Sequence, residues 1–174
     1  VLCGLVNPSG KLADTFAARL EDYPSTENFH ESVEYVDYTE DIYVGYRYFE
    51  TIPGVAEKVV YPFGYGLSYT TFEVETQKAW EEADSIKVQV KVTNTGDMAG
   101  KEVVQLYYSA PQGQLKKPAK ELGAFKKTRL LQPGEGQTMV LSVTKEAMAS
   151  YDDLGKVAKS AYVLEKGAYA FYIG

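Results

Sequence analysis

Hydrophobic and polar residues alternate along the second half of the chain in short runs that are typical of half-buried β-strands. In the run 86–92, every second residue is apolar: Ile86, Val88, Val90 and Val92. A period of two places these side chains on one face of a strand and the residues between them on the other. We therefore expect the valines to point into a hydrophobic core and Lys91 to face the solvent.

The same alternation predicts further strands over residues 69–75, 102–109, 121–127, 138–144, 161–164 and 168–173. Three of them offer clear apolar faces, made of Val104, Leu106 and Tyr108, of Met139, Leu141 and Val143, and of Tyr169, Phe171 and Ile173. Turn-forming residues separate the runs, as at Asn94–Gly96. About seven short strands divided by turns are typical of an immunoglobulin-like or fibronectin type III-like antiparallel β-sandwich. Because the chain has one cysteine and no cysteine pair, the fibronectin-like form is favoured.

The first part of the chain is less regular. The aromatic-rich segment 41–50 predicts a strand, Asn7–Gly10 predicts a tight turn, and the composition of residues 13–22 allows a short helix. The Gly- and Pro-rich run 61–71 then precedes the alternating strands. We interpret this run as a domain junction, with one domain over residues 1–67 and a second over residues 68–174.

Composition and charge exclude several classes of function. The formal net charge is −6 and no long basic run occurs, which argues against binding to nucleic acid or to an anionic membrane surface. No apolar run reaches the roughly 20 residues of a membrane span. The single cysteine, Cys3, allows no internal disulfide and is expected to be a small buried thiol. His30 has no partners at metal-ligand spacing, so we expect no metal site.

Five motifs occur in a fixed order along the chain: NPSGKL at 7–12, YVGYRYF at 43–49, YPFGYGLSYTT at 61–71, VTNTGD at 92–97 and LQPGE at 131–135. Together they resemble the C-terminal part of family 3 glycoside hydrolases, the β-glucosidase and β-xylosidase group. The resemblance implies a mainly β chain, in which the end of an incomplete α/β sandwich domain precedes a complete fibronectin type III-like domain. Relatives usually have proline where this chain has Ala13 and Ala17, which favours an extended segment there. They usually have glycine where this chain has Asp41.

The resemblance also implies a chemistry for the parent enzyme, which would hydrolyse terminal β-linked sugars with retention, through a covalent glycosyl-enzyme and without metal or organic cofactor. Such an enzyme needs two carboxyl groups about 5 Å apart. In the family the nucleophilic Asp, often followed by Trp, lies in a barrel domain, and the acid/base Glu precedes the NPSGKL motif. No Asp-Trp pair occurs here, and neither position is on this chain. We therefore expect no catalytic residue here, an inactive isolated chain, and the remaining domains of the parent enzyme as its partners. The substrate of the parent would be a β-linked oligosaccharide or glycoside.

Other charged residues have plainer interpretations. The pairs Glu81–Glu82 and Asp152–Asp153 lie in polar stretches and are predicted to be solvated, as is the basic loop Lys116–Lys120. Glu40 and Arg47 flank the YVGYR segment. They could form an ion pair that fixes a domain interface, or alternatively a clamp on sugar hydroxyls; we favour the structural pair.

Aromatic residues crowd one segment: Tyr35, Tyr38, Tyr43, Tyr46, Tyr48 and Phe49. We expect them to belong to a core or an interface, although aromatic rings also stack on sugars. A second hypothesis for the whole chain is a stand-alone carbohydrate-binding or protein-interaction module. Exposed, coplanar rings on one sheet face would favour that module, and aromatic residues buried at a junction would favour a supporting role within an enzyme.

Overall fold

The computed structural model describes residues 1–174 and divides them into two compact units. The first unit consists of residues 1–10, 66–117 and 121–174, and the second of residues 11–65 and 118–120. Both units therefore include residues from distant parts of the sequence. The boundary between residues 67 and 68 stays a prediction. No helix is long and apolar enough to cross a membrane.

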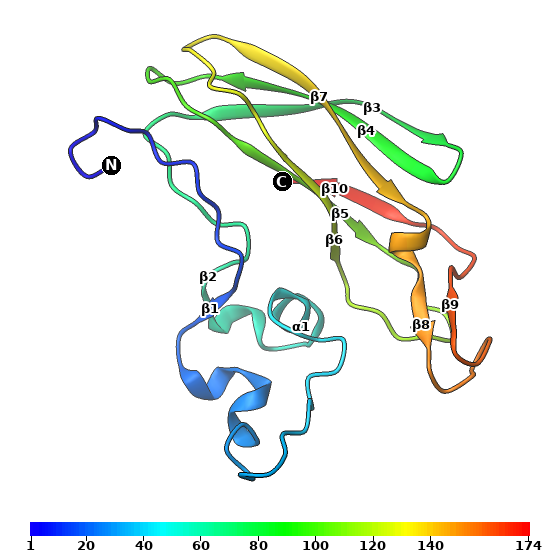
Figure 1. Cartoon of the computed structure of the whole chain (residues 1–174). Helices are drawn as coiled ribbons and strands as arrows, with labels where there is room; N and C mark the ends of the chain where they lie inside the picture. The colour runs from blue at the N-terminus through cyan, green and yellow to red at the C-terminus, as the bar shows by residue number, and fades with distance from the viewer. The chain divides into compact units, whose positions relative to one another are not determined.

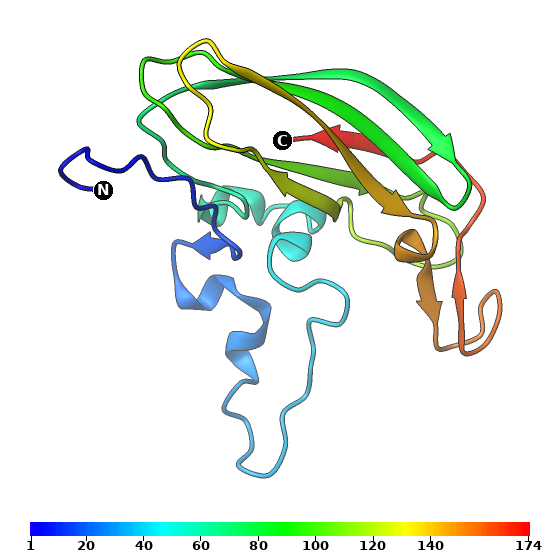
Figure 2. The same ribbon diagram turned by 45° about the horizontal axis from the view of Figure 1, so that its top comes forward.

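The first unit is built from two three-stranded antiparallel sheets, stacked face to face in Figures 1 and 2. One sheet has the order β3-β4-β7 and consists of β3 (Phe72–Glu82), β4 (Ser85–Asn94) and β7 (Gly136–Thr144). The other has the order β10-β5-β6 and consists of β10 (Ala170–Ile173), β5 (Val103–Ser109) and β6 (Glu121–Lys127). A short 3-10 helix, η4 (Glu146–Met148), leads into a separate hairpin of β8 (Ser150–Asp152) and β9 (Ala161–Val163). The antiparallel β-sandwich is confirmed, and β8 is an addition that alternation did not predict.

The core of this unit lies between the two sheets, as the alternation predicted. Val90 and Val92 on β4 are completely buried, and Val90 lies opposite Met139 on β7. Leu106 on β5 is also completely buried, and Phe171 on β10 packs against the same cluster. The predicted inward faces of these strands are confirmed.

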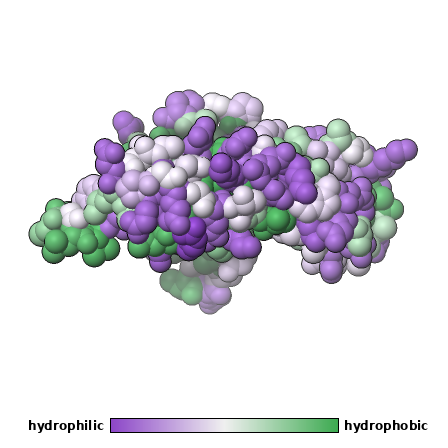
Figure 3. All heavy atoms as spheres, turned by 90° about the horizontal axis from the view of Figure 1, so that it is seen from above, coloured by the Kyte–Doolittle hydropathy of each residue, from purple (hydrophilic) through white to green (hydrophobic).

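The outer face of the β3-β4-β7 sheet is polar. Lys91 is exposed, Lys87 pairs with Glu82 at 2.5 Å, and Gln89 Nε2 donates to Gln77 Oε1 at 2.7 Å. Figure 3 looks onto the molecule from above this sheet and shows mostly hydrophilic atoms there. This face therefore has the character of a solvated surface.

Asn94, at the end of β4, satisfies its buried amide completely. Its Oδ1 accepts from Thr70 Oγ1 at 2.7 Å and from the backbone N–H of Gly96 at 3.2 Å. Its Nδ2 donates to the carbonyl oxygens of Met98 and Leu131, both at 2.9 Å. One side chain thus joins three loops, which goes beyond the local turn that the sequence predicted.

The second unit contains short elements: β1 (Phe16–Ala17), η1 (Leu20–Asp22), η2 (Pro24–Glu27), α1 (Tyr46–Thr51), η3 (Ala56–Lys58) and β2 (Val59–Tyr61). β1 and β2 pair antiparallel. Phe49 is buried and its ring meets the Tyr23 ring edge-on, with the centroids 5.6 Å apart. An apolar anchor on α1 therefore holds this helix to the segment of η1 and η2.

One local prediction in this unit is wrong, and an alternative that the composition left open does not occur. Residues 41–50 do not form a strand, because Gly45 has φ +58 and redirects the chain into α1. Residues 13–22 form no α-helix; they contain β1 and then η1, in line with the extended segment implied by the resemblance. Asp41 has φ +52, a left-handed conformation that glycine adopts freely and Asp tolerates. The glycine expected in relatives suits this conformation.

The predicted tight turn at Asn7–Gly10 is also wrong, since these residues carry no turn. Asn7 Oδ1 instead accepts from the backbone N–H of Tyr69 at 2.8 Å and from Ser68 Oγ at 3.0 Å. Its Nδ2 donates to the Ala99 carbonyl at 3.0 Å. Long-range partners thus replace the local hydrogen bond by which an Asn stabilises a turn.

Candidate functional site: a buried lysine and glutamate

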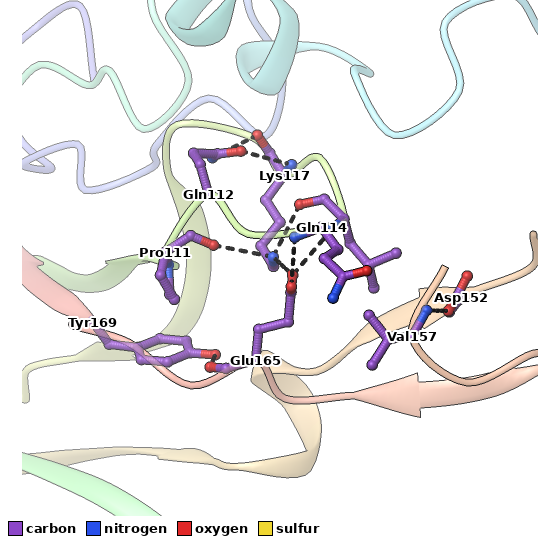
Figure 4. Close-up of polar contacts among 9 residues, drawn as sticks. Pro111, Gln112, Gln114, Lys117, Asp152, Val157, Glu165 and Tyr169 are labelled. Atoms are coloured by element: carbon purple, nitrogen blue, oxygen red, sulfur yellow. Dashed lines mark hydrogen bonds and ion pairs between the residues drawn. The ribbon is translucent and has the colours of Figure 1, made fainter. Parts of the chain in front are cut away.

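The loop between β5 and β6 contains a buried cation. The Lys117 side chain is 1% exposed, so the prediction that it belongs to a solvated connection is wrong, whereas its neighbour Lys116 is exposed. Lys117 Nζ donates to the carbonyl oxygens of Pro111 at 3.0 Å and Leu115 at 3.1 Å, and to Glu165 Oε2 (Figure 4). An ammonium group has three N–H donors, so three acceptors satisfy it fully.

Glu165, on the segment between β9 and β10, completes this arrangement. Its Oε1 accepts from the backbone N–H of Gln114 at 2.6 Å, and its Oε2 accepts from that of Leu115 at 3.2 Å. The hydrogen bond from Lys117 holds the pKa of Glu165 below its usual range, and although burial opposes this shift, the two backbone N–H groups add to it. Glu165 is therefore an ionised carboxylate with all of its partners in place.

The surroundings of the pair are fixed as well. Gln112 Nε2 donates to the Lys117 carbonyl at 3.0 Å, and Gln112 Oε1 accepts from the Lys117 backbone N–H at 3.2 Å. The Tyr169 hydroxyl donates to the Glu165 carbonyl at 3.0 Å. Burial, with the Glu165 charge as a smaller cause, raises the pKa of Tyr169. Backbone and side chains on both sides of the ion pair are thus held in one geometry.

Asp152, at the end of β8, is a buried carboxylate. It was predicted to be solvated, which is wrong, because the loop 155–158 folds over it; the adjacent Asp153 is exposed as predicted. Its Oδ1 accepts from the N–H groups of Gly155 at 2.8 Å and Lys156 at 3.0 Å, and its Oδ2 accepts from Val157 at 2.6 Å and Ala158 at 2.9 Å. Burial raises the pKa of Asp152, but the four donors outweigh it and leave the pKa below its usual range. The Asp152 carboxylate therefore holds the β8–β9 loop in place through these four hydrogen bonds.

Acid should weaken the hydrogen bonds between the Asp152 carboxylate and the β8–β9 loop. The pKa of Asp152 is lower in the folded chain than the usual value of about 3.9. The stability that its ionised carboxylate contributes is therefore fully present above about pH 3.9 and is lost as the pH falls through the folded pKa. The variant Asp152→Asn keeps one acceptor but no charge. We expect it to be less stable than the parent sequence at pH 7, by a margin that shrinks below about pH 4. Thermal melts from pH 7 to pH 2 measure this; a margin that does not change with pH would contradict the assignment.

The carboxyl groups with a shifted pKa share one direction of shift. The carboxyl groups whose pKa is shifted are Glu81, Glu82, Glu135, Asp152 and Glu165, and each of these pKa values is lowered. A glycosidase acid needs a raised pKa. Glu81 and Glu82 are exposed as predicted and pair with Lys145 and Lys87. No group of three or more His, Cys, Asp or Glu side chains is arranged to hold a metal ion.

The other predicted site residues are dispersed. Glu40 lies in the loop before α1 and Arg47 lies in the first turn of that helix, so they do not flank a strand; their ion pair stays a prediction. Cys3 is exposed, and the prediction of a buried thiol is wrong. The aromatic group splits, since Phe49 is buried while Tyr38 is 88% exposed. A pocket of about 400 Å³ in the second unit contains no carboxylate and is lined by Leu20, Tyr23, Ser25, Thr26, Phe29 and His30.

Comparisons with known proteins divide the chain in two. Residues 1–69 match the glycosyl hydrolase family 3 C-terminal domain, and residues 102–174 match the fibronectin type III-like domain. Beta-glucosidase A of Butyrivibrio fibrisolvens is 65% identical over the whole of this chain, which spans 23% of that protein.

Solved structures of beta-glucosidases also match this chain over its whole length. A beta-glucosidase from Paenibacillus barengoltzii matches the whole chain with a TM-score of 0.95 and 57% identity. Beta-glucosidase 3B of Thermotoga neapolitana in complex with glucose matches with a TM-score of 0.89 and 43% identity. The chain covers 19% of the first structure and 24% of the second, so it spans about a fifth of the length of these relatives.

Proposed function

The chain belongs to family 3 of the glycoside hydrolases, and we propose that it is a non-catalytic, domain-stabilising part of a retaining β-glucosidase. The enzyme would release terminal β-linked sugars through a covalent glycosyl-enzyme, with both catalytic carboxyl groups supplied by its other domains. The partners of the chain are then those domains, and the substrate is a β-linked oligosaccharide or glycoside.

One observation carries this proposal: the buried carboxylate of Asp152 and the half-buried carboxylate of Glu165 both accept hydrogen bonds at each of their oxygens. Asp152 accepts four backbone N–H groups, and Glu165 accepts two backbone N–H groups and the Lys117 ammonium. An acid/base residue must exchange a proton with the substrate, and a nucleophile needs an uncovered oxygen. Carboxylates bound in this way stabilise loops and leave the chemistry to groups elsewhere in the enzyme.

Activity measurements test the assignment. We expect the purified 174-residue chain to release no aryl alcohol from an aryl β-glucoside, whereas the full-length enzyme turns the same substrate over. In the full-length enzyme, Glu81→Gln and Glu82→Gln should leave kcat/KM unchanged, because both groups are exposed and paired with lysines. Turnover by the isolated chain that disappears on changing one of its own carboxylates would refute the proposal.

The alternative of a stand-alone carbohydrate-binding module receives little support from the sandwich. Two exposed aromatic rings that contact each other, Tyr151 and Tyr162, lie on the β8–β9 hairpin, with centroids 5.2 Å apart. Their planes make an angle of 61°, so the two rings meet edge to face and are not coplanar. Two rings in this arrangement do not form the flat platform that the alternative required.

A further inference from the structure

The β8–β9 hairpin carries a group of exposed apolar side chains, in contrast to the polar outer face of the β3-β4-β7 sheet. In Figures 1 and 2 the hairpin extends away from the ends of the two sheets. We name five exposed residues of this segment the hairpin patch: Tyr151, Leu154, Val157, Tyr162 and Leu164. We propose that the hairpin patch is an interaction surface that binds a part of the parent enzyme outside this chain.

Hydrogen bonds within the hairpin hold the patch in one arrangement. Tyr151 and Tyr162 lie opposite each other in the strand pair, and their rings are in contact. Side chains alternate along a strand, so Asp152 points the other way, where it accepts the backbone N–H of Val157 and of three neighbours. A surface that is already ordered loses less conformational entropy when a partner binds.

The size of the patch favours a covalently attached partner. Exposed fractions between 41% and 73% correspond to on the order of 500 Å² of surface. That is less than the roughly 800 Å² per partner in a stable complex of separate molecules. It suits a contact between domains of one chain, whose interfaces bury about 600–1,500 Å² in total. Attachment also keeps the partner at an effective concentration on the order of millimolar.

The charges around the patch favour an acidic partner over a second copy of the hairpin. Lys156, Lys159 and Lys166 are exposed, and Asp153 is the one exposed acidic side chain of the segment 151–166. The hairpin is therefore locally basic in a chain of net charge −6. A two-fold contact between hairpins would gather the lysines of both copies at one interface, where they repel each other. An apolar surface with a rim of carboxylates is complementary to the patch.

The parent enzyme has room for such a surface. The chain spans 23% of one beta-glucosidase relative and 19% of another, so most of an enzyme of this kind lies outside it. The inference rests on one element of the proposed function, namely that the chain is part of a longer enzyme. It goes further because it identifies which residues bind the rest. Its tests measure side-chain accessibility and stability, so they fail or succeed independently of any test of activity.

Hydroxyl-radical footprinting of the full-length enzyme, read by mass spectrometry, tests whether the patch is covered. The rate at each residue is divided by its rate in the denatured enzyme. Tyr162 and Leu154 should be modified about tenfold more slowly in the folded enzyme, because the core of an interface excludes water. Trp80, on the β3-β4-β7 sheet, is the control and should be protected far less.

Two outcomes of the footprint overturn the proposal. If the patch is modified as readily as Trp80, purified enzyme leaves it free for some other ligand, such as a carbohydrate or a membrane. If it is protected only at concentrations at which the enzyme self-associates, its occupant is a second copy.

Tyr162→Asp in the full-length enzyme tests the apolar part of the contact. We expect a lower melting temperature, together with about tenfold faster modification of Tyr151 and Leu154, because a carboxylate in an apolar interface has no partner. Thr138→Asp is the matched control, since Thr138 is exposed on β7 opposite Lys91. It should change neither quantity. Unchanged protection of Tyr151 in Tyr162→Asp contradicts the proposal.

A charge reversal tests the acidic rim and leaves the patch itself intact. Lys156→Glu with Lys159→Glu should also expose Tyr162, because like charges would then face each other across the contact. Lys91→Glu with Lys101→Glu changes the net charge equally at exposed positions elsewhere in the unit and should not. If Tyr162→Asp does not yield folded enzyme, the lysine variants decide. Tyr162 that stays protected in Lys156→Glu with Lys159→Glu overturns the acidic partner.

Discussion

Val90→Asp should unfold the β-sandwich. Val90 is completely buried between the two sheets and faces Met139, so the new carboxylate would have no polar partner. Burying an unpaired carboxylate costs several kcal/mol, against a total stability of about 5–15 kcal/mol for a typical domain. The near-ultraviolet circular dichroism of the folded protein should be lost at 25 °C.

Lys91→Asp provides the control for this variant. The introduced group is the same and the position is the next one along β4, but Lys91 is exposed on the polar outer face. Its melting temperature should stay close to that of the parent sequence. Equal tolerance of the two substitutions would mean that the facing of β4 is assigned incorrectly.

Asn94→Asp should be nearly as damaging although it changes almost no volume. The new carboxylate oxygen would replace the Nδ2 donor and lie about 2.9 Å from the carbonyl oxygens of Met98 and Leu131. Two hydrogen bonds would become repulsive contacts in a site that excludes water, at a cost of about 3–5 kcal/mol. Denaturant unfolding at pH 7 measures the loss.

The pH dependence of Asn94→Asp gives a second, independent test. Burial raises the pKa of such a carboxyl above its unfolded value of about 3.9, so the penalty is complete above the folded pKa and fades as the pH falls toward 4. Asp97→Asn, the reverse change at a nearby exposed position, should have no measurable effect. If the Asn94→Asp deficit were the same at pH 4 and pH 7, the buried hydrogen-bond arrangement would be wrong.

The sandwich was predictable because its strands bury one face. Alternation in 86–92 and 138–144 carries the necessary information locally, and the structure places Val90 and Leu141 in the core accordingly. Segment 41–50 failed for a local reason too: aromatic residues favour strands, but the backbone of Gly45 turns the chain into α1. The prediction relied on the strand propensity of the aromatic residues, whereas the conformation of Gly45 determines the structure of this segment.

The buried charges were not predictable in the same way. Lys117 and Glu165 are 48 positions apart, and nothing in either neighbourhood indicates that they meet. Asp152 did carry a signal, since Gly155 follows it three positions later, as in a turn whose first residue accepts backbone N–H groups. That spacing would have suggested a turn in which Asp152 accepts backbone N–H groups, although not that Asp152 is buried. The Lys117–Glu165 pair depends on tertiary structure alone.

The interleaving of the two units has a consequence for how the protein is made. The side chain of Asn7 bonds to Ala99, 92 positions away, and Lys127 Nζ bonds to the Ser9 carbonyl, 118 positions away. The second unit likewise includes Pro118–Lys120. Domains usually fold as they leave the ribosome, N-terminal part first. Here Thr51 and Glu50 cannot contact Ala119 and Lys120 until the β5–β6 loop has been synthesised, so both units should acquire their full protease resistance late and close together in time.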